Sequence, residues 1–105
     1  MSAGMGSDVE AGAAGDAALR STALLHAALA RAARSRLDDA RRPLAATDMQ
    51  LMFSGAPGDS PQVQAQATGG GRSVCFCEAE LLDAQGRTVA RGMATFRYAE
   101  VGASR

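Results

Sequence analysis

The chain has no lysine and no tryptophan, and aromatic residues make up only 4% of it. All of its basic residues are arginines, 11 in number, and they are balanced by 11 acidic residues to a net charge of zero. A neutral chain gives no electrostatic case for binding nucleic acid or an anionic membrane. No apolar run approaches the roughly 18 residues that a membrane-spanning helix needs, so we expect no span.

Cysteine is also scarce, and the only two residues, Cys75 and Cys77, stand one position apart. A Cys-x-Cys pair without a second cluster of cysteine or histidine is not a zinc pattern, so we expect no metal site. We interpret both as small buried hydrophobic residues of a reduced protein. The first 15 residues lack the basic and apolar regions of a secretory signal peptide, which favours a cytoplasmic location.

A chain of 105 residues is long enough for one small domain. Residues 1–14 show no periodicity, and we predict a disordered lead-in there. We assign residues 15–99 to the domain and residues 100–105 to a flexible tail. A domain of this size buries roughly two thirds of its unfolded surface, so its marginal stability favours a partner.

Residues 16–36 are rich in alanine and predict a helix with Asp16 as its N-cap. Pro43 excludes a helical continuation beyond it. Small side chains let such a helix lie close to the surface on which it packs. The predicted buried stripe consists of Leu19, Ala23, Ala27 and Ala30, with Leu24 and Ala28 beside it.

The rest of the chain predicts strands, because apolar and polar residues alternate between turn sequences. The four predicted strands cover residues 44–53, 62–68, 72–82 and 87–98. In the second strand we expect Val63, Ala65 and Ala67 to point inward. The residues that share one face are Met49, Leu51 and Phe53 in the first strand, and Ala90, Gly92, Ala94, Phe96 and Tyr98 in the last. The sequence therefore predicts an α+β fold, with one Ala-rich helix packed on an antiparallel sheet.

The last two strands flank the turn sequence Asp-Ala-Gln-Gly at residues 83–86. If the turn has four residues, Glu78 lies opposite Arg91 and the two form a cross-strand ion pair. A bulge at Gly86 would slip this register by one residue and break the pair. We therefore interpret the charges of this hairpin as the solvated face of a sheet.

These residues resemble the hotdog-fold thioesterase superfamily, in particular acyl-CoA thioesterases of the phenylacetate-degradation (PaaI-like) type. The resemblance is carried by Gly-Arg-Ser at 71–73, Glu-Ala-Glu-Leu at 78–81, "DAQGRTVA" at 83–90 and Ala-Thr-Phe at 94–96. "ATDMQLMFSGAP" is similar to an earlier strand of the family, and the Ala-rich helix to its central helix. The resemblance covers residues 16–98 and implies a homodimer or homotetramer with sheets joined edge to edge.

The chain departs from the family at the start of the helix, where "AGAAGD" replaces the usual His-Gly-Gly. The family's catalytic carboxylate lies about two turns into the helix, and counting from Gly15 leads to Thr22 or Ala23. Neither residue is an acid. Gly15 and the first helical amides remain candidates for stabilising the oxyanion, and Thr22 is a candidate for orienting a water, although it can instead bond its own helix.

Asp48 is the substitute base, because a related class of tandem-hotdog acyl-CoA thioesterases resembles its strand and uses an aspartate there. Such a carboxylate would activate water or attack the thioester carbonyl. Its candidate partners are Gln64, Gln66 and Thr68. The alternative is that Asp48 is an exposed polar residue on a strand. The single histidine, His26, lies one turn after Thr22, and we interpret it as a surface or boundary residue of the helix and not as a base.

The sequence "TGGGRS" at residues 68–73 is the best candidate for ligand binding. Glycines let the backbone approach a ligand closely, and an arginine offers a fork for phosphate. The resemblance implies that this segment meets coenzyme A, which would enter as part of the substrate and not as a separate cofactor. The candidate residues are Gly70, Gly71, Arg72 and Ser73; the alternative is a flexible turn.

The function implied by the resemblance is hydrolysis of acyl-CoA or similar acyl thioesters. The missing His-Gly-Gly and helix carboxylate favour an alternative, a non-catalytic hotdog-like domain that dimerises or binds an acyl or CoA ligand. The third hypothesis is that the sequence comes from a truncated gene model. In-frame sequence upstream of Met1 encoding two further strands and a His-Gly-Gly would establish it.

Overall fold

The computed structural model describes residues 2–37 and 42–99, with side chains from residue 15 onwards. Its elements, in chain order, are α1 (Ser2–Ser35), β1 (Leu44–Phe53), β2 (Gln62–Gly70), β3 (Val74–Leu82) and β4 (Thr88–Tyr98). The strands thus agree with the sequence prediction to within two residues at each end. The predicted tail at residues 100–105 lies outside the described residues.

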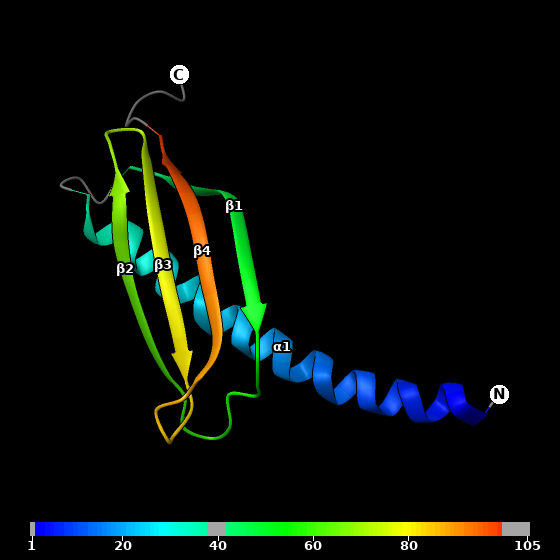
Figure 1. The fold of residues 1–105 in the computed structure, drawn as a ribbon. Coiled ribbons are helices and arrows are strands. Elements are labelled where there is room, and N and C mark those ends of the chain that lie inside the picture. The colour runs from blue at the N-terminus through cyan, green and yellow to red at the C-terminus, as the bar shows by residue number, and fades with distance from the viewer. Residues whose placement is uncertain (1, 38–41, 100–105) are drawn as a thin grey trace.

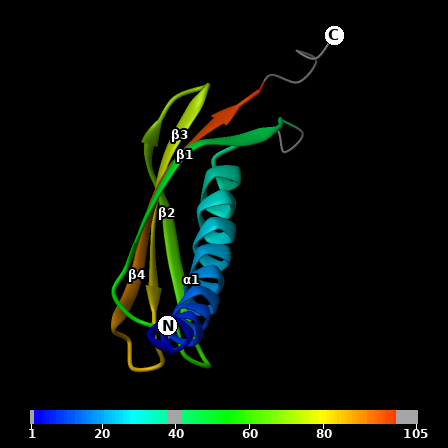
Figure 2. The ribbon, with the colours of Figure 1, turned by 90° about the vertical axis from the view of Figure 1, so that its right-hand side faces the viewer.

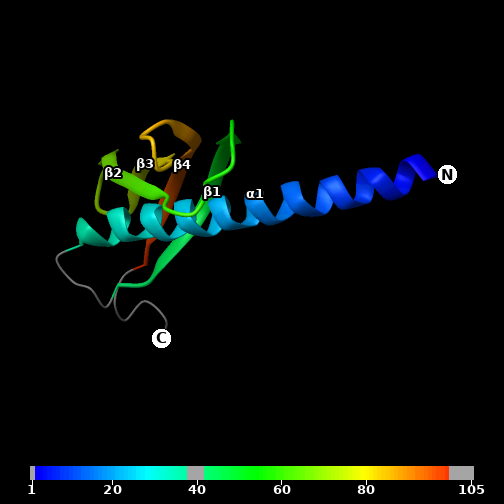
Figure 3. The ribbon, with the colours of Figure 1, turned by 90° about the horizontal axis from the view of Figure 1, so that it is seen from below.

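The strands form one antiparallel sheet in the order β1-β4-β3-β2. α1 runs along one face of this sheet and projects beyond it towards the N-terminus (Figure 1). Views along and below the sheet show that no helix covers the other side in the described chain (Figure 2 and Figure 3). The predicted α+β architecture is confirmed. We call the uncovered side the open face.

The helix extends further towards the N-terminus than the sequence predicted. It begins at Ser2, so residues 2–14 are helical where a disordered lead-in was expected. Asp16 lies inside the helix and is not its N-cap. The physical reason is that the docked part of the helix is already nucleated. Each further residue then adds a hydrogen bond at a small cost in conformational entropy.

The buried stripe of α1 also differs from the prediction. Leu19 is 69% exposed, and Ala23 and Ala27 are exposed as well. The buried side chains of the helix are Ser21, Leu25, Ala28, Leu29 and Ala33. Alanine occurs on every side of this helix, so the alanine pattern does not single out one face. The two large leucines, Leu25 and Leu29, determine the buried face by filling the core.

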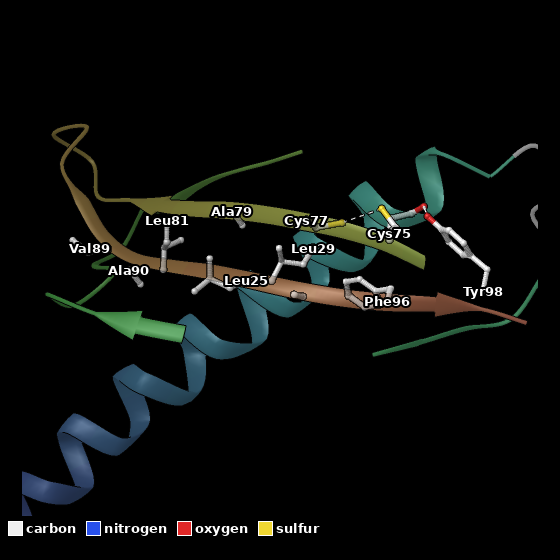
Figure 4. Packing of buried hydrophobic residues seen from close by; sticks show 12 residues of the cluster. Leu25, Leu29, Cys75, Cys77, Ala79, Leu81, Val89, Ala90, Phe96 and Tyr98 are labelled. Atoms are coloured by element: carbon white, nitrogen blue, oxygen red, sulfur yellow. Dashed lines mark hydrogen bonds between the residues drawn. The ribbon is translucent and has the colours of Figure 1, made fainter. Parts of the chain in front are cut away.

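Between helix and sheet lies a core that is small and well filled (Figure 4). Gly92 of β4 lets the two layers approach, because a Cβ there would stand 3.2 Å from Leu29 and 3.0 Å from Leu51. The sheet contributes these buried hydrophobic residues: Cys75, Cys77, Ala79, Leu81, Val89, Ala90, Ala94, Phe96 and Tyr98. The shared face predicted for the last strand is confirmed, and it is the buried one. Ala65 of β2, predicted to point inward, is exposed, because β2 is an edge strand.

The β3–β4 hairpin has a different register from the predicted one. Glu80, and not Glu78, lies opposite Arg91, and Glu78 lies opposite Met93. The turn closes through the Asp83 amide, which donates to the Arg87 carbonyl at 2.9 Å. An irregularity after Leu81 then shifts the pairing further. The total slip is two residues, so every side chain keeps its predicted face.

Candidate functional site

The glycine turn between β2 and β3 has a backbone that only glycine can adopt without strain. Gly70 has φ +135°, and a Cβ there would collide with the Val74 carbonyl oxygen and the Arg36 guanidinium. The Gly71 amide donates to the Val74 carbonyl at 2.9 Å and closes the turn. The predicted binding residues Gly70, Gly71, Arg72 and Ser73 are all exposed on this turn.

Arg36, at the C-terminal end of α1, fixes the turn from the helix side. Its Nη1 donates to the carbonyls of Gly69 and Val74, each at 3.4 Å. Along the sequence Arg36 is the last residue of the predicted helix, where a cation is favoured by the helix dipole. Its contact with residues more than 30 positions away follows from helix docking, which no local pattern indicates.

Arg42 reaches the same turn from the segment before β1. Its guanidinium donates to the carbonyls of Arg72 at 2.8 Å and Ala99 at 3.1 Å. It also lies 5.3 Å from the centre of the Tyr98 ring, within cation–π range. Arg36 and Arg42 therefore both contact the turn that contains Arg72. We call residues 36, 42 and 69–73 the arginine end. Such a group can bind phosphate.

Two thiols and a phenol lie beneath the arginine end. Cys75 and Cys77 are free and buried, with their Sγ atoms 3.5 Å apart. The Tyr98 hydroxyl donates to the Ala33 carbonyl at 2.7 Å and ties β4 to α1. Both cysteines face the core, as the sequence predicted for small hydrophobic residues.

The two thiols differ in acidity. Burial alone would raise the pKa of Cys75, but the polar groups of Tyr98, Arg36 and Cys77 beside it favour the thiolate and outweigh burial, so that pKa is lowered. Burial, together with the neighbouring Cys75, raises the pKa of Cys77 to about 12. Burial also raises the pKa of Tyr98 to about 12. The arrangement keeps Cys77 protonated and apolar at neutral pH.

Asp48 lies on the open face, on β1, where it is exposed and opposite Thr95 of β4. A bulge at this point frees Thr47, whose hydroxyl donates to the Thr95 carbonyl at 3.0 Å. Asp48 shares a shallow pocket of about 140 Å³ with Thr68, one of its expected partners. The other residues of this pocket are Gln50, Phe76, Cys77, Glu78, Met93, Ala94 and Thr95.

The other expected partners of Asp48, Gln64 and Gln66, lie one step further along the open face. They line a larger hollow of about 360 Å³ together with Glu78, Arg91 and Met93. Within that hollow Arg91 Nη2 lies 3.2 Å from Glu80 Oε2. Of the expected partners, the structure therefore brings only Thr68 into the pocket of Asp48.

Gly15 and Thr22 are on α1, which packs against the opposite face of the sheet from Asp48. Gly15 is inside the helix, where an amide donates to the carbonyl four residues earlier. The Thr22 hydroxyl donates to the Ala18 carbonyl at 2.7 Å. Thr22 thus bonds its own helix, which was the alternative to orienting a water. Within one copy of the chain these two residues and Asp48 do not meet. His26 is exposed on the same helix.

Over residues 2–37 and 42–99, no three histidine, cysteine or acidic side chains gather closely enough to hold a metal ion. Over the same described ranges, no helix combines the length and apolarity needed to cross a membrane.

Comparison with solved structures identifies the architecture as a hotdog fold. A Bacillus halodurans protein solved with CoA superposes with a TM-score of 0.67 at 19% identity, over 72% of this chain and 54% of that one. A phenylacetic acid degradation-related protein of the thioesterase class, from Ralstonia eutropha JMP134, gives 0.66 at 25% identity, over 72% and 57%. A protein from S. sahachiroi gives 0.66 at 23% identity, over 74% and 64%.

The structural neighbours include thioesterase-superfamily proteins, as the sequence resemblance predicted. This chain spans little more than half the length of the Bacillus halodurans and Ralstonia eutropha proteins. No protein-family model matches the chain. No curated protein matches it either.

Proposed function

We propose that this chain binds acyl-CoA or a similar acyl thioester and hydrolyses it. The observation that carries the proposal is one of position. The sheet register brings Asp48 into the pocket of Thr68, directly before the glycine turn of the arginine end. The proposal is supported because Thr68, which shares this pocket, directly precedes the candidate phosphate-binding residues along the chain. Structural neighbours with CoA or of the thioesterase class support the same ligand.

In the proposed reaction the arginine end holds the phosphates of CoA, and the thioester reaches the pocket of Asp48. Coenzyme A is part of the substrate, and no separate cofactor takes part. The Asp48 carboxylate removes a proton from water as the water oxygen bonds to the thioester carbonyl carbon. The carbon–sulfur bond then breaks, the CoA sulfur takes up a proton, and a free carboxylic acid is left.

A second candidate is a domain that binds a CoA-type ligand without hydrolysing it. The observation that favours it is that Asp48 belongs to the open face, whereas Gly15 and Thr22 belong to α1, which packs on the other face of the sheet. A carboxylate on one face cannot act on a carbonyl that is polarised from the other face. In this reading Asp48 is an exposed strand residue without a chemical role.

The two candidates are separated by thiol release from a panel of aliphatic and aromatic acyl-CoAs. We expect turnover by the whole chain and its loss by about 10²-fold or more in Asp48→Asn. Asp59→Asn, which changes an exposed loop carboxylate outside both pockets, is the matched control and should keep full activity.

Other outcomes would assign the function differently. Turnover that survives in Asp48→Asn and disappears in His26→Asn would move the base to the helix. An absence of turnover by a folded chain that still binds CoA would select the binding domain.

A further inference from the structure

The two cysteines of the chain lie side by side on β3 and take no part in the proposed reaction. Cys75 and Cys77 project to the same face of the strand, because residues two apart share a face. Their Sγ atoms are 3.5 Å apart, a contact that Figure 4 marks with a dashed line. Both thiols are free, and at 0% and 2% exposure both are closed off from water. The pair is therefore a buried dithiol that the proposed function leaves unexplained.

The two sulfurs differ in their surroundings. The Tyr98 hydroxyl points towards Cys75 (Figure 4), and the Arg36 guanidinium contacts the carbonyl of Val74, the residue before it. Burial alone would raise the pKa of Cys75, but Tyr98 and Arg36 favour its thiolate, and that pKa is lowered. Burial, and then the neighbouring Cys75, raises the pKa of Cys77 to about 12. One sulfur is thus suited to act as a nucleophile, and the other stays a protonated thiol.

The cover over Cys75 is thin on the side of β2. Its partner in that strand is Gly70, and residues 69–71 are all glycine, so no side chain of β2 stands beside the thiol there. Arg36 holds the turn from the helix through two hydrogen bonds of 3.4 Å each. Bonds of that length are weak, so we expect small local openings of the turn to expose the sulfur. Hydrogen peroxide is little larger than water and needs no wider path.

The spacing of the strand permits a disulfide between the two cysteines and leaves it strained. Residues two apart on a strand have Cα atoms about 6.6 Å apart. That distance is near the upper end of the roughly 4.4–6.8 Å found in disulfides. The two sulfurs must approach from 3.5 Å to about 2.05 Å. A bond formed under strain is readily reduced again, so the pair can be oxidised and reduced in turn.

We propose that Cys75 and Cys77 form a modification site, at which a peroxide converts the dithiol reversibly into a disulfide within β3. In the first step the Cys75 thiolate attacks one oxygen of hydrogen peroxide. A sulfur–oxygen bond forms, the oxygen–oxygen bond breaks and hydroxide leaves. In the second step the Cys77 sulfur attacks the sulfenic acid of Cys75. The sulfur–sulfur bond forms, and the hydroxyl group leaves as water with the proton of Cys77. The two thiols together lose two electrons, which reduce the peroxide.

The disulfide acts on the arginine end, which lies directly beside it. Drawing Cys75 towards Cys77 moves a backbone with no free space next to it, because a Cβ on Gly70 would stand 2.9 Å from the Cys75 Cα. The Gly71 amide closes the adjoining turn through its bond to the Val74 carbonyl. Oxidation should loosen that bond, and hydrogen exchange of the Gly71 amide should become about threefold faster or more.

The test is mass spectrometry of the whole folded chain after treatment with hydrogen peroxide. The chain should lose the mass of two hydrogen atoms and regain it in dithiothreitol. Cleavage after arginine leaves both cysteines in one peptide, residues 73–87, and the loss should be confined to that peptide. The rate should hardly change in urea below the unfolding transition, because a local opening exposes little surface.

Single variants assign the two roles, and each is the matched control of the other. Cys77→Ser should gain one oxygen atom at Cys75, because no second thiol is left to resolve the sulfenic acid. Cys75→Ser should react at least about tenfold more slowly than Cys77→Ser, since its remaining thiol stays protonated. If serine unfolds the core, alanine replaces it at both positions, because alanine buries no polar group.

Several results would overturn the proposal. Peroxide could leave both thiols of the folded chain intact, or oxidise them only in step with the unfolded fraction in urea. The disulfide could join two chains instead of forming within one. Cys75→Ser could react as fast as Cys77→Ser. An unchanged exchange rate of the Gly71 amide would overturn the link to the arginine end. None of these measurements involves a thioester or CoA, so they do not depend on the proposed function.

Discussion

At the scale of single residues, the arginine end depends on a backbone geometry that glycine alone permits. Gly70→Ala should lower the free energy of unfolding by about 1–3 kcal/mol, because φ is positive and the new methyl group meets Val74 and Arg36. Gly71→Ala is the matched control, since its Cβ would meet nothing within 4 Å, and should stay within about 0.5 kcal/mol. Urea unfolding of both variants measures the difference, and equal losses would contradict it.

Ser21 is a buried polar group that works against stability. It is 1% exposed, and its hydroxyl has no hydrogen-bond partner among the described residues. Ser21→Ala should raise the free energy of unfolding by about 1 kcal/mol, because an unpaired hydroxyl is costly to bury and alanine favours the helix. The midpoint of urea unfolding should rise with an unchanged slope. A lower midpoint would show that the hydroxyl has a partner in solution.

The buried thiol and phenol predict a loss of stability at alkaline pH. Folding raises the pKa of Cys77 from about 9.0 to about 12, so between these values the unfolded chain releases a proton that the folded chain keeps. Tyr98 acts in the same direction, whereas Cys75, whose pKa is lowered, opposes it. The free energy of unfolding should therefore fall as the pH rises from about 9 to about 12. In Cys77→Ala the fall should be shallower, and an identical pH profile would exclude Cys77 as its source.

At the scale of elements, the hairpin register decides which charges interact. A double-mutant cycle on Glu80 and Arg91 should give a coupling of about 0.2–1 kcal/mol, because the two side chains are directly opposed at 3.2 Å. The same cycle on Glu78 and Arg91 should give clearly less. A larger coupling for Glu78 would restore the register predicted from the sequence.

The element scale also shows how far sequence reasoning reaches. Strand faces were predictable, because alternation in β4 and β1 has a period of two and survives a slip of two residues. The hairpin register was not predictable, since it depends on the hydrogen bond from the Asp83 amide to the Arg87 carbonyl and on an irregularity after Leu81. Neither is evident from the sequence. The buried side of α1 was not predictable either, because alanine occurs on every side of that helix.

The candidate site was only partly predictable, for a related reason. The glycine turn and Asp48 stand out as local sequence features. Arg36 and Arg42 reach the turn through hydrogen bonds that cross 30 or more residues of chain. The contacts of Arg36 form only when α1 docks on the sheet, and those of Arg42 only when the strands pair. No spacing along the sequence therefore reveals them.

At the scale of the whole molecule, the fold separates three surfaces. α1 covers one face of the sheet, the arginine end lies at the β2–β3 turn, and the open face carries Asp48 beside the charged residues of β3 and β4. The pocket of Asp48 belongs to the open face, where Phe76, Glu78 and Met93 also line it.

The central claim is that the arginine end binds CoA, since both candidate functions require it. The most direct measurement is calorimetric titration of CoA into the whole chain and into Arg72→Ala, with Arg31→Ala on the exposed side of α1 as the control. We predict saturable binding that weakens at least about tenfold in Arg72→Ala and is unchanged in Arg31→Ala. No binding of CoA by the folded chain, or equal binding by all three proteins, would contradict the account.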